Sequence, residues 1–122
     1  MTIIGNHMKF NAHKSLRERV RSFYLDALQC TTMPSPAPDL DLFLFPDSFV
    51  LGVFFCEQAN VLSEEDHLKA AWLEIKTNDV PEMKRRLIEF GVKEVDYPDT
   101  SRFYFQAPGG QVFRLASVDG GI

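Results

Sequence analysis

Polar and aromatic side chains alternate with apolar ones in two stretches of the chain. One stretch carries His7, Lys9 and Asn11 at every second position, and a later one carries Trp72 and Glu74 in the same way. Because successive side chains of a strand point to opposite faces, each stretch predicts a strand with one packed face and one wetter face. Such groups can transfer protons, ligate a metal ion or hydrogen-bond an organic molecule.

The second half of the chain predicts the elements that would position these side chains. A strand over 72–77 is followed by a capping box from Asp79 to Glu82, which begins a helix, and by Gly91 where that helix should end. Two further apolar segments flank the sequence Ala-Pro-Gly-Gly at 107–110, which is typical of a hairpin turn.

The first half repeats this order. It predicts a strand over 7–12, a helix over 15–29 opened by a second capping box from Ser15 to Glu18, and a hairpin over 41–55. The predicted fold class is therefore α+β, with two βαβββ modules. One domain covers 1–122; the parts predicted within it are module one (7–57), a linker (58–69) and module two (70–117).

Composition excludes several classes of protein. The 122 residues include 13 basic and 17 acidic ones, and this acidic balance without a basic cluster argues against nucleic-acid binding. No apolar run is long enough to span a bilayer, and no signal peptide is evident. The two cysteines form no metal or redox motif, so a reduced, cytoplasmic setting is expected with both thiols buried.

The chain resembles the vicinal oxygen chelate superfamily, which includes glyoxalase I, bleomycin-resistance proteins and extradiol dioxygenases. The resemblance covers nearly the whole chain. It lies mainly in Leu-Glu-Ile-Lys-Thr-Asn-Asp-Val (73–80), Phe-Gly-Val (90–92) and Phe-Gln-Ala-Pro-Gly-Gly-Gln-Val-Phe (105–113), and more loosely in Ser-Phe-Tyr (22–24). It implies that the paired modules form a cupped, incomplete barrel.

The resemblance also implies where a metal would bind. Enzymes of the family hold a divalent ion through His, Glu or Gln at the start of a module's first strand and Glu on its last. These positions fall at His7, near Gly52, at Trp72 and at Arg114. Only His7 matches, and an arginine repels a metal cation. The resemblance thus implies a degenerate metal site with no cofactor, with a divalent metal as the alternative.

In this family the first and last strands of a module are neighbours, which would bring Trp72, Glu74 and Arg114 together. Glu74 and Arg114 would then form a structural ion pair, or Arg114 would be free for a ligand carboxylate or phosphate. His7 is either a hydrogen-bonded rim residue or a metal-independent acid or base. The predicted ligand-binding residues are His7, Lys9, Asn11, Phe54, Trp72, Glu74 and Arg114.

The predicted function is binding of a small organic molecule in the cup, with catalysis left open. One alternative is a metal-dependent lyase, isomerase or dioxygenase using His7 and ligands from elsewhere in the chain or a partner chain. Another is a drug-sequestering protein of the bleomycin-resistance kind, and a third is a structural or regulatory interaction module. The resemblance further implies a homodimer.

Overall fold

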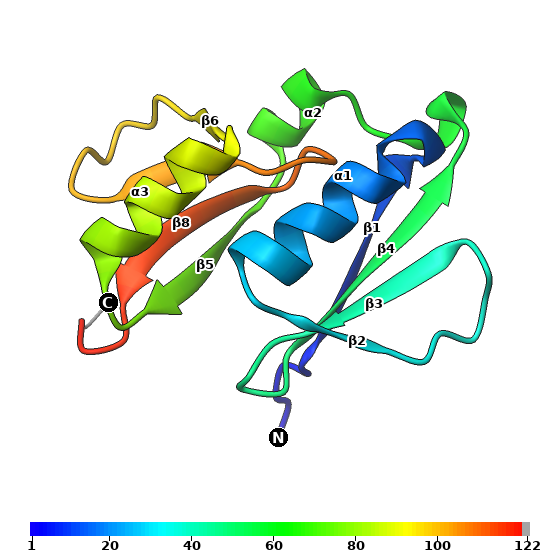
Figure 1. The fold of residues 1–122 in the computed structure, drawn as a ribbon, viewed down its shortest axis with the longest axis horizontal. Helices are drawn as coiled ribbons and strands as arrows, with labels where there is room; N and C mark the ends of the chain where they lie inside the picture. The colour runs from blue at the N-terminus through cyan, green and yellow to red at the C-terminus, as the bar shows by residue number, and fades with distance from the viewer. Residues whose placement is uncertain (121–122) are drawn as a thin grey trace. The chain divides into compact units, whose positions relative to one another are not determined.

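The computed structural model describes residues 1–120 and divides into two compact units, residues 1–62 and the chain from residue 63 onward. Each unit contains one four-stranded sheet and one longer helical segment (Figure 1). This confirms the α+β class with two βαβββ modules. The boundary between the units lies inside the segment that the sequence predicts as a linker. Among the described residues, no helix is long and apolar enough to cross a membrane.

Unit 1 follows the predicted order, and a short edge strand after the helix completes the βαβββ module. Its elements are β1 (His7–His13), α1 (Arg17–Ser22), β2 (Thr31–Met33), β3 (Leu40–Leu44) and β4 (Val50–Cys56). A 3₁₀ turn (Lys14–Leu16) precedes α1, a π-helical turn (Phe23–Ala27) continues it, and a second 3₁₀ turn (Gln58–Asn60) follows β4.

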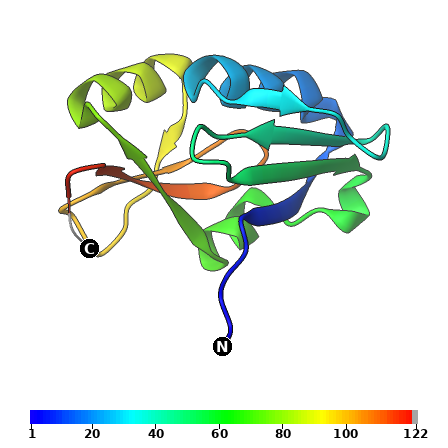
Figure 2. The ribbon, with the colours of Figure 1, turned by 90° about the horizontal axis from the view of Figure 1, so that it is seen from below.

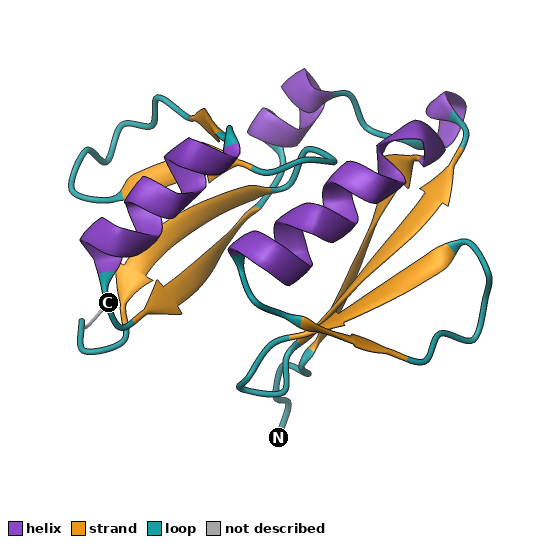
Figure 3. Cartoon of the chain, in the orientation of Figure 1, coloured by secondary structure: helices purple, strands orange, loops and turns teal. Residues whose placement is uncertain are grey.

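Unit 2 repeats this arrangement. Its elements are α2 (Glu64–Lys69), β5 (Trp72–Thr77), α3 (Val80–Phe90), β6 (Lys93–Glu94), β7 (Phe103–Gln106) and β8 (Val112–Ser117). Figure 3 shows α2 as a short helix directly before β5. The sequence predicts the bounds of β5 as observed, and it predicts α3 to within one residue.

The two sheets have equivalent strand orders. Unit 1 is ordered β1-β4-β3-β2 and unit 2 is ordered β5-β8-β7-β6. In each sheet the unit's first and last strands are parallel neighbours, and the other pairs are antiparallel. Within each unit the longer helix covers one face of its own sheet, which Figures 1 and 2 both show. The opposite face carries the side chains predicted to bind a ligand.

Aromatic residues form the core of unit 1 between its helix and sheet. Phe23 and Tyr24 are fully buried, and the Tyr24 ring stacks on Phe43 of β3 with their centroids 5.0 Å apart. At the start of α1, the Arg17 guanidinium lies 5.0 Å from the centre of the Phe55 ring. The helix is therefore fixed to β3 and β4 by ring contacts along its length.

Two arginines of α1 share one carboxylate of β3. Asp41 accepts hydrogen bonds from Arg17 at 2.8 Å and from Arg21 at 2.7 and 3.1 Å. Burial acts to raise the pKa of the Asp41 carboxyl, but the bonds from Arg21 and Arg17 outweigh it and hold that pKa below its usual value. Asp41 thus ties the helix to the sheet as an ionised group.

The predicted capping box at Ser15 is wrong. The chain first makes a 3₁₀ turn, and the side chain of His13 accepts the hydrogen bond from the Ser15 amide at 3.1 Å. Ser15 therefore lies inside the turn rather than before it, and α1 begins only at Arg17. The histidine nitrogen performs the role that the sequence pattern assigned to a hydroxyl.

The helix of unit 2 begins and ends as predicted. The side chain of Asp79 accepts a hydrogen bond from the Glu82 amide at 3.1 Å, and Pro81 lies in the first turn. Gly91 ends the helix with φ 105°, a left-handed conformation that glycine adopts without strain. Leu87 is fully buried, as are Phe105, Phe113 and Leu115 of the sheet.

A buried polar contact connects α2 to the β7–β8 turn. The Gln106 amide donates to the carbonyls of Glu64 and Gly110, both at 2.9 Å. His67 packs against the same turn so closely that a Cβ added to Gly110 would lie 2.4 Å from its ring. Gly110 also has φ 107°, so glycine is required there both for space and for backbone conformation.

Candidate functional site

Strand pairing in unit 2 brings Glu74 and Arg114 together. They are register partners on the parallel strands β5 and β8. The Nε and one terminal nitrogen of Arg114 donate to the same oxygen of Glu74, at 2.9 and 2.5 Å. The side chains are about one-fifth and one-quarter exposed, so the pair is partly shielded from water. The prediction of an ion pair across adjacent strands is confirmed.

Three aromatic rings surround this pair, and we call Trp72, Tyr97 and Tyr104 the aromatic cluster. The guanidinium of Arg114 lies 4.4 Å from the centre of the Trp72 ring, a cation–π contact. The Tyr97 and Tyr104 rings stack with centroids 4.3 Å apart, and both meet Trp72 edge to face. The Trp72 indole also donates a hydrogen bond to the Tyr97 hydroxyl at 3.3 Å.

Charged groups extend the network on either side of Arg114. Tyr104 donates to Asp99 at 3.1 Å, and hydrogen bonds with Tyr104 and Glu74 raise the pKa of Arg114 above its usual value. On the other side, the Lys76 ammonium lies 3.9 Å from the second oxygen of Glu74. Two cations therefore alternate with two anions across this face.

The predicted residues of unit 1 also gather on the sheet face opposite the helix. Lys9 donates to the Asn11 side chain at 2.8 Å, and its ammonium lies 5.9 Å from the centre of the Phe54 ring. The Asn11 amide donates in turn to the backbone of Asn60 at 2.9 Å. The amide of Asn11 is thus held by the protein, and Phe54 supplies an apolar surface beside it.

His7 lies at the exposed start of β1, opposite Val50 in the register. Its Nδ1 is 2.8 Å from the side-chain oxygen of Asn6, whose amide donates to the carbonyl of Ser48. This geometry corresponds to the hydrogen-bonded rim residue among the predicted alternatives. A role of His7 in ligand binding or proton transfer stays a prediction.

Comparison with known proteins gives a clear result at the level of structure. No protein-family model matches the sequence, and no curated protein matches it. Solved structures do match along almost the whole chain. A putative glyoxalase family protein from Bacillus anthracis has a TM-score of 0.72 at 20% identity, covering 96% of this chain and 98% of that one.

Two further neighbours carry named activities. The fosfomycin resistance protein FosX from Mesorhizobium loti matches with a TM-score of 0.66 at 17% identity, over 94% of this chain and 92% of its own. The trypanothione-dependent glyoxalase I of Leishmania major matches at 0.67 and 20% identity, over 95% and 87%. The chain has the vicinal oxygen chelate fold.

Of the four positions at which the resemblance implies metal ligands, His7 alone carries a side chain that ligates metal ions. Arg114 places a cation at the position where the resemblance implies a glutamate, and the Trp72 indole has no lone pair available to a metal. Gly52 has no side chain, and a Cβ there would lie 3.2 Å from Leu42 and 3.5 Å from Leu40. Within residues 1–120, no three His, Cys, Asp or Glu side chains are grouped to hold a metal.

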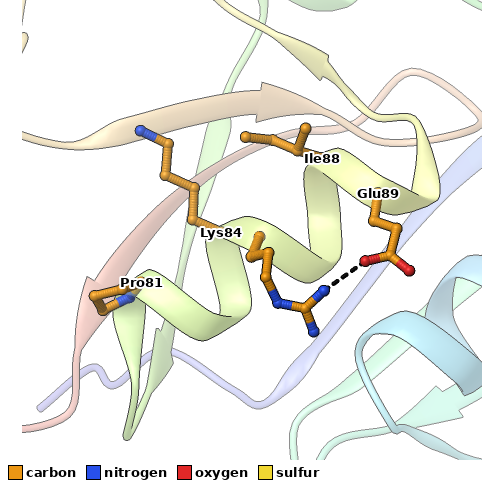
Figure 4. Close-up of a pocket in the computed structure, with 5 residues that line it drawn as sticks. Pro81, Lys84, Ile88 and Glu89 are labelled. Atoms are coloured by element: carbon orange, nitrogen blue, oxygen red, sulfur yellow. Dashed lines mark hydrogen bonds and ion pairs between the residues drawn. The ribbon is translucent and has the colours of Figure 1, made fainter.

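A surface recess lies apart from the Glu74–Arg114 pair and the aromatic cluster, along α3. Figure 4 shows Pro81, Lys84, Ile88 and Glu89 around it, with an ion pair between Arg85 and Glu89. The recess is shallow and open to solvent, and its charged groups are already paired or solvated. The cluster on the sheet face is the better candidate because charged and aromatic groups converge there from three strands and a loop.

Two members of the cluster do not appear among the predicted site residues. Tyr104 could have been found from strand parity, since it is the register partner of Arg114 on β7. Tyr97 belongs to the connection between β6 and β7, where no periodic pattern places a side chain.

The predicted burial of both thiols also needs correction: Cys30 is buried, whereas Cys56 at the end of β4 is half-buried.

Proposed function

We propose that the chain binds a small organic molecule on the sheet face that carries the aromatic cluster, without a metal ion as the anchor. The observation that supports this most directly is the Glu74–Arg114 pair stacked on Trp72. At this position a metalloenzyme of the same fold needs a ligand with a free lone pair. Here the position carries a guanidinium, which offers only N–H donors and a positive charge.

The arrangement in unit 1 supports the same proposal. Leu40 and Leu42 border Gly52 where a carboxylate ligand would stand, and Phe54 and the stem of Lys9 add apolar surface. A mostly apolar wall with a few convergent polar groups is the usual composition of a small-molecule site. By the same reasoning we assign Lys9, Asn11 and Phe54 to ligand binding, and we assign His7 to the rim of this surface of unit 1.

The alternative is a metal-dependent lyase, isomerase or dioxygenase that uses His7 with ligands from elsewhere. The glyoxalase and fosfomycin resistance neighbours favour keeping this alternative, and the second of them also keeps drug binding open. A partner chain could supply missing ligands, since we propose a homodimer for this protein. Light scattering on the purified protein measures its oligomeric state directly.

Metal analysis distinguishes the two functions. We expect no stoichiometric metal after dialysis and no rise in unfolding temperature with nickel, zinc, manganese or iron(II). A tight ligand of the native state must raise its stability by mass action, so a real metal site cannot escape this measurement. Stoichiometric metal that is lost in His7→Ala and kept in the neighbouring control Lys9→Ala would contradict the proposal and favour the metalloenzyme.

A further inference from the structure

The charges on the sheet face of unit 2 neutralise one another. Arg114 is bound to Glu74 and Tyr104, Lys76 lies 3.9 Å from Glu74, and Tyr104 donates to Asp99. Each of these charged groups thus has an opposite charge or a hydrogen-bond partner on the same sheet face. The two cations and two anions cancel in number, so a ligand that approaches this face meets no net charge. Lys76 is more exposed and more loosely paired than Glu74 and Arg114.

An anionic ligand is disfavoured by this arrangement. A carboxylate could reach the Arg114 guanidinium only by displacing Glu74 or by lying beside it, and two carboxylates within a few ångströms repel each other. Two of the N–H donors with which arginine binds carboxylates are already directed at one oxygen of the protein's own Glu74.

A cationic ligand is disfavoured for the corresponding reason. Aromatic clusters bind cations over the ring face, yet one face of Trp72 is already covered by Arg114 at 4.4 Å. A second cation would lie next to this guanidinium and near the Lys76 ammonium. What stays open to a ligand is part of Trp72, which is intermediate in exposure, and Tyr97, which is 38% exposed, together with the half-exposed ammonium of Lys76.

Resting on the proposed function, we infer that Glu74 determines the specificity of this face: by holding Arg114 it excludes anions, and the ligand is an uncharged planar compound with a hydrogen-bond acceptor. The ligand stacks against Trp72 and Tyr97, and its carbonyl or hydroxyl oxygen accepts from Lys76. Glu74 acts here as a positioning residue because it sets the availability of another side chain.

Three probes of nearly equal shape separate charge from size: benzamide, benzoate and benzamidine. Trp72 is the sole tryptophan of the chain, so its indole N–H gives one resonance in a ¹H–¹⁵N spectrum and reports binding at this face. We expect benzamide to shift that resonance saturably, with benzoate and benzamidine binding about tenfold or more weakly because of like-charge repulsion.

Two substitutions reverse this order if the inference is right. Glu74→Gln releases Arg114, so benzoate should become the tightest probe, with a gain of about tenfold over the wild-type protein. Arg114→Gln leaves Glu74 with only the more distant Lys76 ammonium and uncovers one face of Trp72, so benzamidine should become the tightest. Glu82→Gln, which breaks an exposed Glu–Arg pair on α3, is the matched control and should keep the wild-type order.

The outcomes separate the inference from the proposed function. Benzamide and benzoate binding equally to the wild-type protein, or Glu74→Gln leaving their order unchanged, would overturn the inference and leave small-molecule binding intact. A Trp72 resonance that no probe moves, in the wild-type protein or in either variant, would contradict both. The spectra of the variants also show whether each is folded, and if one is not, the other still provides the reversal test.

Discussion

Both hydrogen bonds from Arg114 to Glu74 end on one carboxylate oxygen, Oε2. The second oxygen faces the ammonium of Lys76 at 3.9 Å. Glu74 therefore lies between a guanidinium and an ammonium, and the Glu74–Arg114 ion pair is part of a larger network of opposite charges. Such a partly shielded network depends on all its members, because removing one charge leaves the neighbouring charge less well compensated.

The first prediction concerns this dependence. Arg114→Met should lower the urea midpoint of unfolding more than the double substitution Glu74→Leu/Arg114→Met. The single change leaves a partly buried carboxylate without its main partner, whereas the double change removes both charges. Glu82→Gln on α3 should hardly alter the midpoint, because its pair with Arg85 is exposed. A double variant less stable than the single one would contradict the interpretation.

The second prediction concerns Asp41, which joins α1 to β3. Asp41→Asn should reduce the free energy of unfolding by about 2 kcal/mol, since it weakens charge-assisted hydrogen bonds to two arginines. Chemical denaturation measures this loss, and Asp26→Asn at an exposed position of the same helical segment is the control.

Asp41 also has a defined effect of pH. Its folded-state pKa lies below the ordinary value of 3.8, so its stabilisation is fully present above that value and is lost as the pH falls through the lower, folded-state pKa. The difference in stability between the wild-type protein and Asp41→Asn should therefore shrink as the medium is acidified below pH 3.8. A constant difference through this range would show that charge is not the source of the effect.

The third prediction concerns the contact between Gly110 and His67. Gly110→Ala should destabilise the protein by about 2 kcal/mol or more, because the new Cβ meets the His67 ring and the backbone is left-handed. Combining it with His67→Ala should recover the steric part but not the backbone part, which a double-mutant cycle measures. Gly5→Ala, with nothing within 4 Å of the new Cβ, should have no comparable effect.

The fourth prediction concerns the thiols. Burial raises the pKa of Cys30 to about 12, so this thiol should resist alkylation at neutral pH while half-buried Cys56 reacts. Mass spectrometry after brief iodoacetamide treatment should find the label on Cys56 in the native protein and on both cysteines in urea. Cys30→Ser should leave the native labelling unchanged, and prominent native labelling of Cys30 would refute its burial.

Local signals in the sequence predicted much of the fold. The alternation in β5, the Asp79 cap and Gly91 identify a strand and a helix because each signal depends on residues close together in the chain. The same kind of signal failed at Ser15, where His13 provides the cap from a position that the usual pattern ignores.

Only the site residues that lie on paired strands could be predicted from the sequence. Register places Glu74 opposite Arg114, and alternation then places Trp72 on the same face. Tyr97 reaches the cluster from an irregular connection, and its position depends on ring packing against Tyr104 that no local pattern encodes. Whether Arg114 is free or paired likewise depends on side-chain geometry, which the sequence left open between two alternatives.

The parallel pairing of each unit's first and last strands has a consequence for how the chain folds. β1 is made first, yet its hydrogen-bonding neighbour is β4, the last strand of unit 1. The sheet can be completed only after Cys56 has left the ribosome, and until then β1 lacks its neighbouring strand. Such non-local closure is slow compared with helix formation. All strands of unit 1 leave the ribosome before β5 does, so N-to-C synthesis favours closure of the unit 1 sheet first.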